Sequence, residues 1–263
     1  MCETQIRGMM NKTPERRKKG EIMRLDKLVS MLGFTRSEAK KLISSGRVKI
    51  EDNVLRDPGA NVKDDASIEI GGEIYNVKKH IHVMIHKPSG VLTATEDHKG
   101  ARTVADFLPE ALLRRGIGPV GRLDKDVTGL VIMTTDGQLA HRLISPKWEV
   151  TKRYRATVEG KLDEKCVSAF QTGIQFKDFT SKPAGLEILS ANENESVCLV
   201  YVTEGKFHQV KRMLQAVGHP VITLHREKIA MIELDENLSE GEWRELTDDE
   251  VKKLYILTEM NEK

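Results

Sequence analysis

The residues best suited to chemistry lie between Gly121 and Leu130, where the chain reads Gly-Arg-Leu-Asp-Lys-Asp-Val-Thr-Gly-Leu. Two carboxylates, Asp124 and Asp126, stand beside Arg122 and directly before an apolar stretch that predicts a strand. A carboxylate held in a cleft next to cations can act as a nucleophile or as a base. The same pattern also fits a turn in which Asp126 and the threonine two residues later cap backbone amides.

A second group of polar side chains stands at the beginning of a predicted helix, in residues 204–218. Four apolar residues at helical spacing predict its buried face: Val210, Met213, Leu214 and Val217. Four polar residues crowd its first turn: His208, Gln209, Lys211 and Arg212. Cations near a helix N-terminus oppose the helix dipole, so they indicate a compensating anion, either an aspartate or a phosphate. A solvated basic face is the alternative interpretation.

Two further sets of side chains invite a functional interpretation. Tyr154 is one of only four tyrosines and begins a predicted strand among three cations. Its ring could pack in the core or stack on a nucleobase. His80, His82 and His86 alternate along another predicted strand. Because no carboxylate or cysteine stands nearby at a matching spacing, we do not expect them to bind a metal.

The elements that must position these residues begin with a small helical unit. Apolar residues at helical spacing predict a helix from residue 23 that ends at Gly33, and a capping-box sequence at residues 35–38 begins a second helix. Arg36 and Lys40 share the outward face of this second helix, and Arg47 lies just beyond it. Short strands within residues 48–55 and 66–70 complete the unit.

The longer remainder of the chain alternates predicted strands with predicted helices. The strands are expected at residues 82–85, 129–134, 153–159, 185–189 and 197–202, and the helices at 103–113, 138–144, 163–172 and 209–217. This pattern favours an α+β domain. We therefore expect a basic disordered tail (1–22), the small unit (23–76), a linker (77–82) and the larger domain (83–263).

Composition limits the class of protein. With 263 residues, 31% of them charged and 39% hydrophobic, the chain has the length for two modest domains and the composition of an ordinary globular protein. No apolar run approaches about 18 residues and no secretion signal opens the chain, so we expect a cytoplasmic protein. Three scattered cysteines fit a reducing compartment. Residues 1–50 carry 13 Lys or Arg against 5 Asp or Glu, and this local charge predicts a polyanionic partner.

The segment Gly121–Leu130 resembles the signature motif of the pseudouridine synthases, in the branch typified by ribosomal small-subunit pseudouridine synthase A. Further segments resemble that branch in the same order: Lys87–Gly90, Thr134–Gly137, His141–Pro146, Lys152–Tyr154, Glu204–Met213 and Leu224–Glu227. Residues 23–76 are similar to the S4 RNA-binding domain that this branch carries. Val127 departs from the pattern, since the family commonly has threonine there. Members tend to begin near Met-Arg-Leu-Asp, which makes Met23 a second candidate for the initiator.

The resemblance assigns roles to individual residues. It implies that Asp124 is the catalytic aspartate, that Tyr154 lies against the target base and that Lys211 pairs with Asp124. Arg122 would help to hold the nucleotide outside its helix. Isomerising uridine breaks the bond from C1′ to N1 and joins C1′ to C5, and an ionised carboxylate can either attack C1′ or remove a sugar proton. Neither a redox cofactor nor a metal is implied.

The resemblance also implies a fold and a partner. It implies a catalytic domain with a mixed, largely antiparallel sheet flanked by helices. The expected substrate is ribosomal RNA, with the small-subunit 16S RNA or its assembly intermediate favoured over the large-subunit 23S RNA, and the chain is expected to act as a monomer. Arg36, Lys40 and Arg47 would contact phosphates. Two alternatives are a non-catalytic ribosome assembly factor and a glycoside hydrolase using Asp124 with Asp126.

Overall fold

The computed structural model describes residues 22–64 and 66–260, and the chain divides between Val77 and Lys78 into two compact units. The predicted tail, residues 1–22, lies outside the described residues except for Ile22. The predicted linker, residues 77–82, spans the boundary, and its last residue, His82, already opens a strand. Among the described residues, no helix has the length and apolar character needed to span a membrane.

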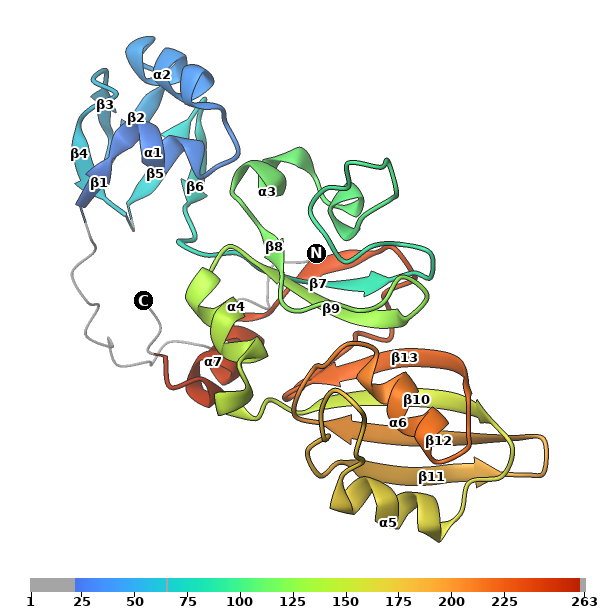
Figure 1. Ribbon diagram of the computed structural model, residues 1–263. Coiled ribbons are helices and arrows are strands. Elements are labelled where there is room, and N and C mark those ends of the chain that lie inside the picture. Colours follow the sequence, from blue (N-terminus) through green and yellow to red (C-terminus); the bar gives the residue numbers. More distant parts are fainter. Residues whose placement is uncertain (1–21, 65, 261–263) are drawn as a thin grey trace, which may run out of the picture. The chain divides into compact units, whose positions relative to one another are not determined.

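The N-terminal unit packs two short helices against small sheets (Figure 1). The helices are α1 (Leu25–Ser30) and α2 (Arg36–Ser44). A four-stranded sheet has the order β3 (Asn53–Leu55), β2 (Val48–Ile50), β5 (Ser67–Ile70) and β6 (Glu73–Asn76), and β1 (Ile22–Arg24) pairs with β4 (Asn61–Lys63). The predicted capping box is confirmed, since Thr35 accepts from the amide of Glu38 while the Glu38 side chain accepts from the amide of Thr35.

The larger unit is built on a long mixed sheet (Figure 1). Its main order is β11 (Gly185–Ala191), β12 (Glu195–Val202), β10 (Lys152–Glu159), β13 (Val221–Ile229), β9 (Thr128–Thr134), β7 (His82–Lys87) and β15 (Trp243–Glu245). At its margins, β14 (Ile232–Glu233) pairs with β13 and β8 (Gly118–Pro119) pairs with β9. Among the described pairings of this sheet, only β13 with β9 is parallel. The predicted fold class, α+β with a largely antiparallel sheet, is confirmed.

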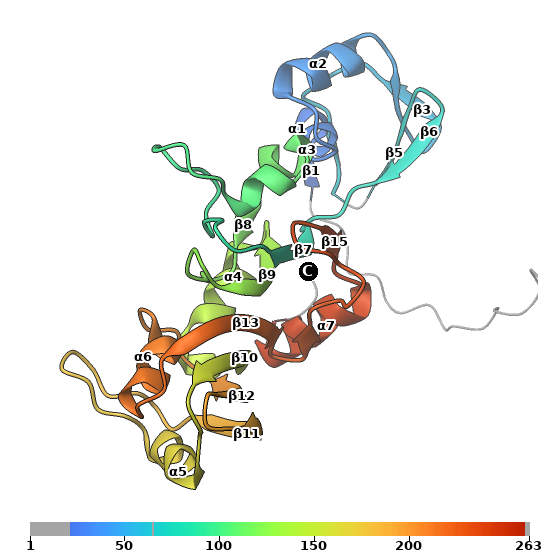
Figure 2. The ribbon, with the colours of Figure 1, turned by 90° about the vertical axis from the view of Figure 1, so that its right-hand side faces the viewer.

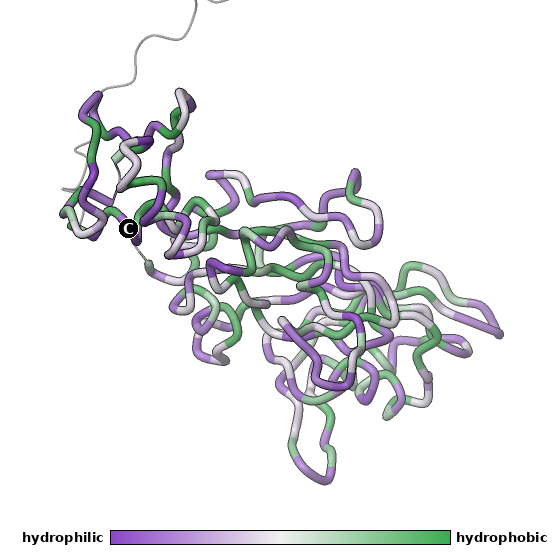
Figure 3. Tube along the Cα trace, turned by 90° about the horizontal axis from the view of Figure 1, so that it is seen from above, coloured by the Kyte–Doolittle hydropathy of each residue, from purple (hydrophilic) through white to green (hydrophobic). Residues whose placement is uncertain are grey.

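Helices cover both faces of this sheet. They are η1 (Val104–Phe107), α3 (Glu110–Arg114), α4 (Gly137–Ile144), η2 (Pro146–Trp148), α5 (Glu164–Thr172), α6 (Gln209–Ala216) and α7 (Asp248–Leu257). Alternate residues of β9 enter different cores: Val131 packs in the core that contains α5 and α6, while Ile132 packs in the core that contains α4 and α7. In Figure 2, α6 and α7 lie near opposite ends of β13, and Figure 3 shows hydrophobic runs along the strands.

Three elements differ from the sequence prediction. The helix expected at residues 103–113 is two short helices, because Pro109 adopts an extended conformation between them. The strand β13 spans nine residues and pairs with three other strands, although the sequence marks only a four-residue motif within it. Helix α7 is absent from the prediction, although Thr247 and Glu250 form a capping box at its start.

Candidate active site

The loop that carries Asp124 connects β8 to β9, and a buried lysine holds it in place. Lys87 is fully buried at the end of β7, and its ammonium donates to the carbonyl oxygens of Pro88 (3.0 Å), Lys125 (3.1 Å) and Val127 (2.7 Å). Burial lowers the pKa of Lys87 to about 8. The hydroxyl of Thr93 also donates to the carbonyl of Leu123. The chain on both sides of Asp124 is therefore fixed by side chains from distant segments.

The end of the same loop requires glycine. Gly129 has φ +108°, and a Cβ atom placed there would lie 2.3 Å from the carbonyl oxygen of Arg226 on the neighbouring strand β13. Only a residue without a side chain permits this approach of two backbones. The contact brings β13 against the start of β9, directly after the loop.

Helix α6 brings Lys211 to both aspartates of the loop. The Lys211 ammonium donates to Asp126 at 2.7 and 2.8 Å and forms an ion pair with Asp124 at 3.4 Å. His208 Nε2 lies 3.5 Å from the other Asp124 oxygen. The hydrogen bond from Lys211 lowers the pKa of Asp126 below its usual value. The compensating anion inferred for the start of this helix is thus a pair of aspartates.

Lys211 also contacts an aspartate with which the sequence does not predict a pairing. It was expected to pair with Asp124, and the two form an ion pair, but its hydrogen bonds go to Asp126, whose side chain is 71% exposed. The alternative interpretation of this segment has Asp126 and Thr128 capping backbone amides. In the structure the Thr128 hydroxyl lies 2.8 Å from Nδ1 of His225, and the Asp126 carboxylate accepts from Lys211.

The four residues expected to act on the substrate line one cavity. Arg122, Asp124, Tyr154 and Lys211 surround a small space of about 70 Å³ whose remaining walls are partly apolar. A wider hollow of about 870 Å³ shares Arg122 and Asp124 with this cavity. The structure thus gathers side chains from the β8–β9 loop, β10 and α6 around Asp124.

A third cavity also borders Tyr154, and four cationic side chains line it. It has a volume of about 210 Å³, and its lining includes Tyr154, Lys152 and Arg226. Arg226 is 3% exposed and donates through Nε to the carbonyl of Leu130, while its Nη2 has no hydrogen-bond partner among the described residues. Burial and the neighbouring Arg226 lower the pKa of Lys152 to about 8.

Several residues of the site have no role assigned from the sequence. In the sequence, Lys87 and Arg226 stand out only within motifs that resemble the family, and His208 stands out only among the polar residues that begin a helix. A lysine two positions after the apolar strand residues 83–85 is a usable signal, because a lysine that continues a buried strand must find acceptors for its ammonium. Arg226 gives a weaker signal, since the consecutive charged residues 226–228 also fit an exposed strand.

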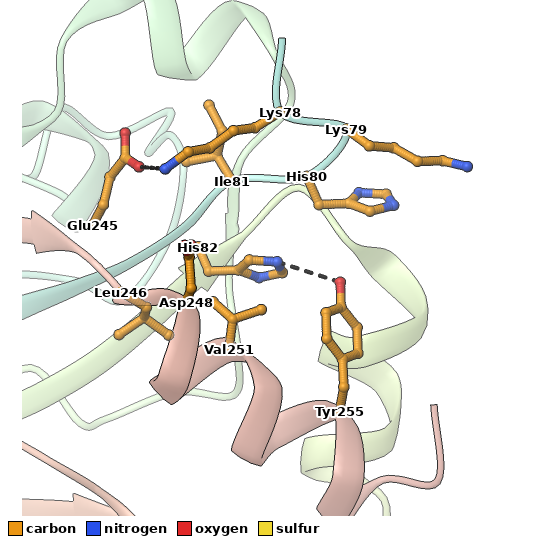
Figure 4. A pocket seen from close by; sticks show the side chains of 10 residues that line it. All are labelled: Lys78, Lys79, His80, Ile81, His82, Glu245, Leu246, Asp248, Val251 and Tyr255. Atoms are coloured by element: carbon orange, nitrogen blue, oxygen red, sulfur yellow. Dashed lines mark hydrogen bonds and ion pairs between the residues drawn. The ribbon is translucent and has the colours of Figure 1, made fainter. Parts of the chain in front are cut away.

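The three histidines considered for metal binding lie in different surroundings. His82 is buried, with Nδ1 2.8 Å from the Thr134 hydroxyl and Nε2 3.4 Å from the Tyr255 hydroxyl (Figure 4). His80 and His82 both line the pocket drawn in Figure 4. His86 lies elsewhere, with Nδ1 2.8 Å from the carbonyl of Leu238. Among the described residues, no three metal-ligating side chains gather in one place.

The side chains expected to contact RNA phosphates belong to the N-terminal unit. Arg36 and Lys40 are exposed on α2, and Arg47 is exposed just before β2. Arg47 also borders a shallow hollow of about 400 Å³ with Phe34 and Leu42. The three cations are thus available to a ligand.

The cavity around Asp124 can support chemistry on a sugar carbon. Asp124 supplies a carboxylate, and the Lys211 cation forms an ion pair with it at 3.4 Å. Tyr154 offers a partly buried aromatic ring in the same cavity, against which a flat base could stack. Arg122 is exposed at the rim and can reach a phosphate.

Comparison with known proteins identifies the family of the chain. The family described as RNA pseudouridylate synthase matches residues 81–216, and the S4 domain matches residues 23–68. The chain is 39% identical over 240 residues to the uncharacterized RNA pseudouridine synthase YtzG of Bacillus subtilis, covering 90% of this chain and 99% of that protein. It is 39% identical over 236 residues to ribosomal small subunit pseudouridine synthase A of Vibrio cholerae, covering 89% and 100%.

Two further comparisons concern another named relative and a solved structure. Ribosomal large subunit pseudouridine synthase B of Bacillus subtilis is 36% identical over 239 residues, covering 90% of this chain and 97% of that protein. The crystal structure of a pseudouridylate synthase superposes with a TM-score of 0.61 at 36% identity, covering 88% of this chain and 99% of that chain. With this coverage, and with an S4 domain preceding a sheet that carries Asp124 in its loop, the chain belongs to the RNA pseudouridine synthases.

Proposed function

We propose that this enzyme converts a uridine of 16S ribosomal RNA to pseudouridine, with Asp124 as the catalytic aspartate. The observation that carries the proposal is the convergence of Asp124, Lys211, Tyr154 and Arg122 on one cavity. These four side chains come from three separate elements. Their shared cavity supplies the carboxylate, its counter-ion, a stacking surface and a phosphate contact that this isomerisation requires.

The reaction rearranges bonds without adding atoms. Asp124 either attacks C1′ or removes a sugar proton, and in both cases the bond from C1′ to N1 breaks. The uracil then turns against the Tyr154 ring and C5 bonds to C1′. In the first route this step breaks the bond between Asp124 and C1′, and in the second Asp124 returns the proton to the sugar. The proton on C5 is finally lost while N1 gains one. Lys211 orients Asp124 through their ion pair, and Arg122 holds the extruded nucleotide by its phosphate.

The choice of the small-subunit RNA is supported by the named relatives. The small subunit synthase of Vibrio cholerae is 39% identical to this chain, and the large subunit synthase of Bacillus subtilis is 36% identical. The alternative substrate is therefore 23S ribosomal RNA. We infer further that the enzyme works as a monomer in the cytoplasm on 16S RNA or its assembly intermediate, with Arg36, Lys40 and Arg47 on phosphates.

Two other functions fit the site less well. A glycoside hydrolase places two carboxyl groups on opposite sides of the scissile bond. Here Asp124 and Asp126 share the single cation of Lys211, so they do not flank a substrate. A non-catalytic assembly factor would have no need to keep a partly buried carboxylate beside a lysine and an aromatic ring.

Mapping pseudouridine in both ribosomal RNAs tests the proposal. A strain that lacks this chain is expected to lose one pseudouridine of 16S RNA, and a plasmid carrying the wild type is expected to restore it. Asp124→Asn, which keeps the size of the side chain but removes its charge, should restore nothing. Loss of a pseudouridine from 23S RNA instead would show that the substrate is the large-subunit RNA. Restoration by Asp124→Asn would contradict the catalytic assignment.

A further inference from the structure

The loop before α6 exposes an aromatic ring at the entrance to the catalytic cavity. Phe207 is 73% exposed, and among the described residues it is the only large hydrophobic side chain that is both exposed and aromatic. It lines the wider hollow of about 870 Å³ together with Arg122 and Asp124. A ligand that covers this ring would remove apolar surface from water.

One face of this ring is already occupied. The ring of Phe207 stacks on the imidazole of His208, with centroids 3.7 Å apart and an angle of 21° between the planes. The same imidazole lies 3.5 Å from Asp124. The His208 imidazole therefore lies between Asp124 and the Phe207 ring, and the outer face of Phe207 is free to stack on a ligand.

The loop holds this pair of rings in a fixed position. The side chain of Gln209, which is 4% exposed, accepts a hydrogen bond from the amide of Lys206 at 2.9 Å and donates to Glu204 at 2.7 Å. His208 adopts a left-handed conformation with φ +50°. A non-glycine residue retains this backbone conformation when its surroundings impose it. The ring is thus presented in advance of binding.

The surroundings of Phe207 are suited to a polyanion. Arg122, Lys125 and Lys206 line the same hollow. An aromatic face among cations is the combination that binds single-stranded nucleic acid, because bases stack on the ring while the cations contact phosphates. Phe207 does not line the small cavity that contains Tyr154, so a base on Phe207 is a different base from the one on Tyr154.

We propose that Phe207 and His208 form a stacking platform for a nucleobase next to the target uridine. This inference rests on the proposed function and extends it, since it adds a second base-binding position to the same site. It also assigns the platform a role in substrate recognition. The neighbouring base is held by its flat face, which makes the contact tolerant of base identity.

The test measures the affinity of the full chain for a short ribosomal RNA fragment centred on the mapped uridine. Phe207→Leu keeps an apolar side chain but removes the ring, and it should weaken binding about 5- to 150-fold. Phe207→Tyr keeps the ring and should bind as the wild type does. Ile256→Ala removes a side chain that is 66% exposed on α7, and it should also leave affinity unchanged.

Fragments with an abasic nucleotide on either side of the target locate the contact. With the base that stacks on Phe207 removed, wild type and Phe207→Leu should bind equally, as a double-mutant cycle requires. Equal binding of both proteins to the intact fragment would overturn the inference, as would a weakening that persists in every abasic fragment. Both results leave pseudouridine formation by the wild type intact. A wild type that forms no pseudouridine in either ribosomal RNA would overturn the proposed function and this inference with it.

Discussion

At the scale of single residues, Lys211 has two tasks that differ in strength. It forms hydrogen bonds with the exposed carboxylate of Asp126 and an ion pair with the more buried Asp124. An ion pair exposed to water contributes little to stability, whereas solvent screens the attraction between a cation and a partly buried carboxylate less strongly. We interpret Asp126 as the residue that positions the Lys211 ammonium. Asp124 is then the carboxylate that this ammonium assists in the reaction.

Replacing Lys211 should separate catalysis from binding. Lys211→Met is expected to lower single-turnover pseudouridine formation roughly 10- to 150-fold, because a hydrogen bond or close contact between charged groups is worth about 1.5–3 kcal/mol. RNA affinity should remain, since many phosphate contacts carry it. Asp126→Asn is the matched control and should reduce turnover about fivefold or less. A greater loss in Asp126→Asn than in Lys211→Met would reverse the two roles.

His82 should make the stability of the larger unit depend on pH. Burial lowers the pKa of His82 from 6.5 to about 4 in the folded chain. Between these two pH values the unfolded chain binds a proton that the folded chain does not, so the free energy of unfolding falls as pH falls from 6.5 to 4. The decrease should reach about 3 kcal/mol.

Urea unfolding at several pH values measures this effect. His82→Phe removes the titrating group, so the difference in unfolding free energy between wild type and variant should change across this pH interval. The neighbouring His80 and Asp136 also titrate, but they are present in both proteins. A pH-independent difference would show that His82 is protonated alike in the folded and unfolded chains.

At the scale of elements, the β8–β9 loop depends on contacts that the local sequence does not reveal. The sequence motif and its spacing predict Asp124 and its neighbours as candidate site residues, and they also predict the helix that carries Lys211. The acceptors of Lys87 could not be predicted, because Lys125 and Val127 approach it only after β7 and β9 pair. The sharing of Lys211 between two aspartates likewise depends on how α6 packs beside the loop.

The same distinction applies to the secondary structure. The capping box at Thr35 is local, so the sequence predicts it correctly. The nine-residue strand β13 contains three consecutive charged residues, 226–228, and its strand conformation follows from pairing with β10 and β9. Pro109 should have divided the helix expected at residues 103–113, because a proline inside a helix removes a backbone hydrogen bond.

Gly129 gives an element-scale prediction. Gly129→Ala places a methyl group 2.3 Å from the carbonyl oxygen of Arg226, so β9 and β13 must separate at the loop. We expect the free energy of unfolding to fall by roughly 3 kcal/mol. Gly137→Ala is the matched control, because a Cβ there meets nothing within 4 Å. Urea denaturation of both variants checks the difference, and equal midpoints would contradict the close approach of the two strands.

At the scale of the whole molecule, the chain combines two units with separate cores. The core of the N-terminal unit contains Leu28 and Ile43, and it shares no residue with the cores of the larger unit. The chemistry lies in the larger unit, while the cations expected to contact RNA in the smaller unit lie on and just after α2. Affinity and turnover should therefore respond to different substitutions.

The salt dependence of RNA binding tests this division. Arg36→Ala combined with Lys40→Ala should reduce the slope of log affinity against log salt by about 0.7 for each phosphate of single-stranded RNA that the variant no longer neutralises. Single-turnover rates with saturating enzyme should remain near those of the wild type. Lys63→Ala, an exposed cation on β4, serves as the control. An unchanged slope in the double variant would show that these cations of α2 do not contact RNA phosphates.

The buried environment of Lys152 also has a consequence for covalent labelling. An amine attacks electrophiles only in its neutral form, and with a pKa near 8 about one Lys152 side chain in ten is neutral at pH 7, against fewer than about one in a thousand for an ordinary lysine. Acylating reagents small enough to enter the cavity beside Tyr154 should therefore modify Lys152 before surface lysines, and mass spectrometry of limited reaction products would show this order. Lys87 has a similar pKa but is fully buried, so it should remain unlabelled. Lys152 thus offers an attachment point for a covalent inhibitor directly beside the catalytic cavity.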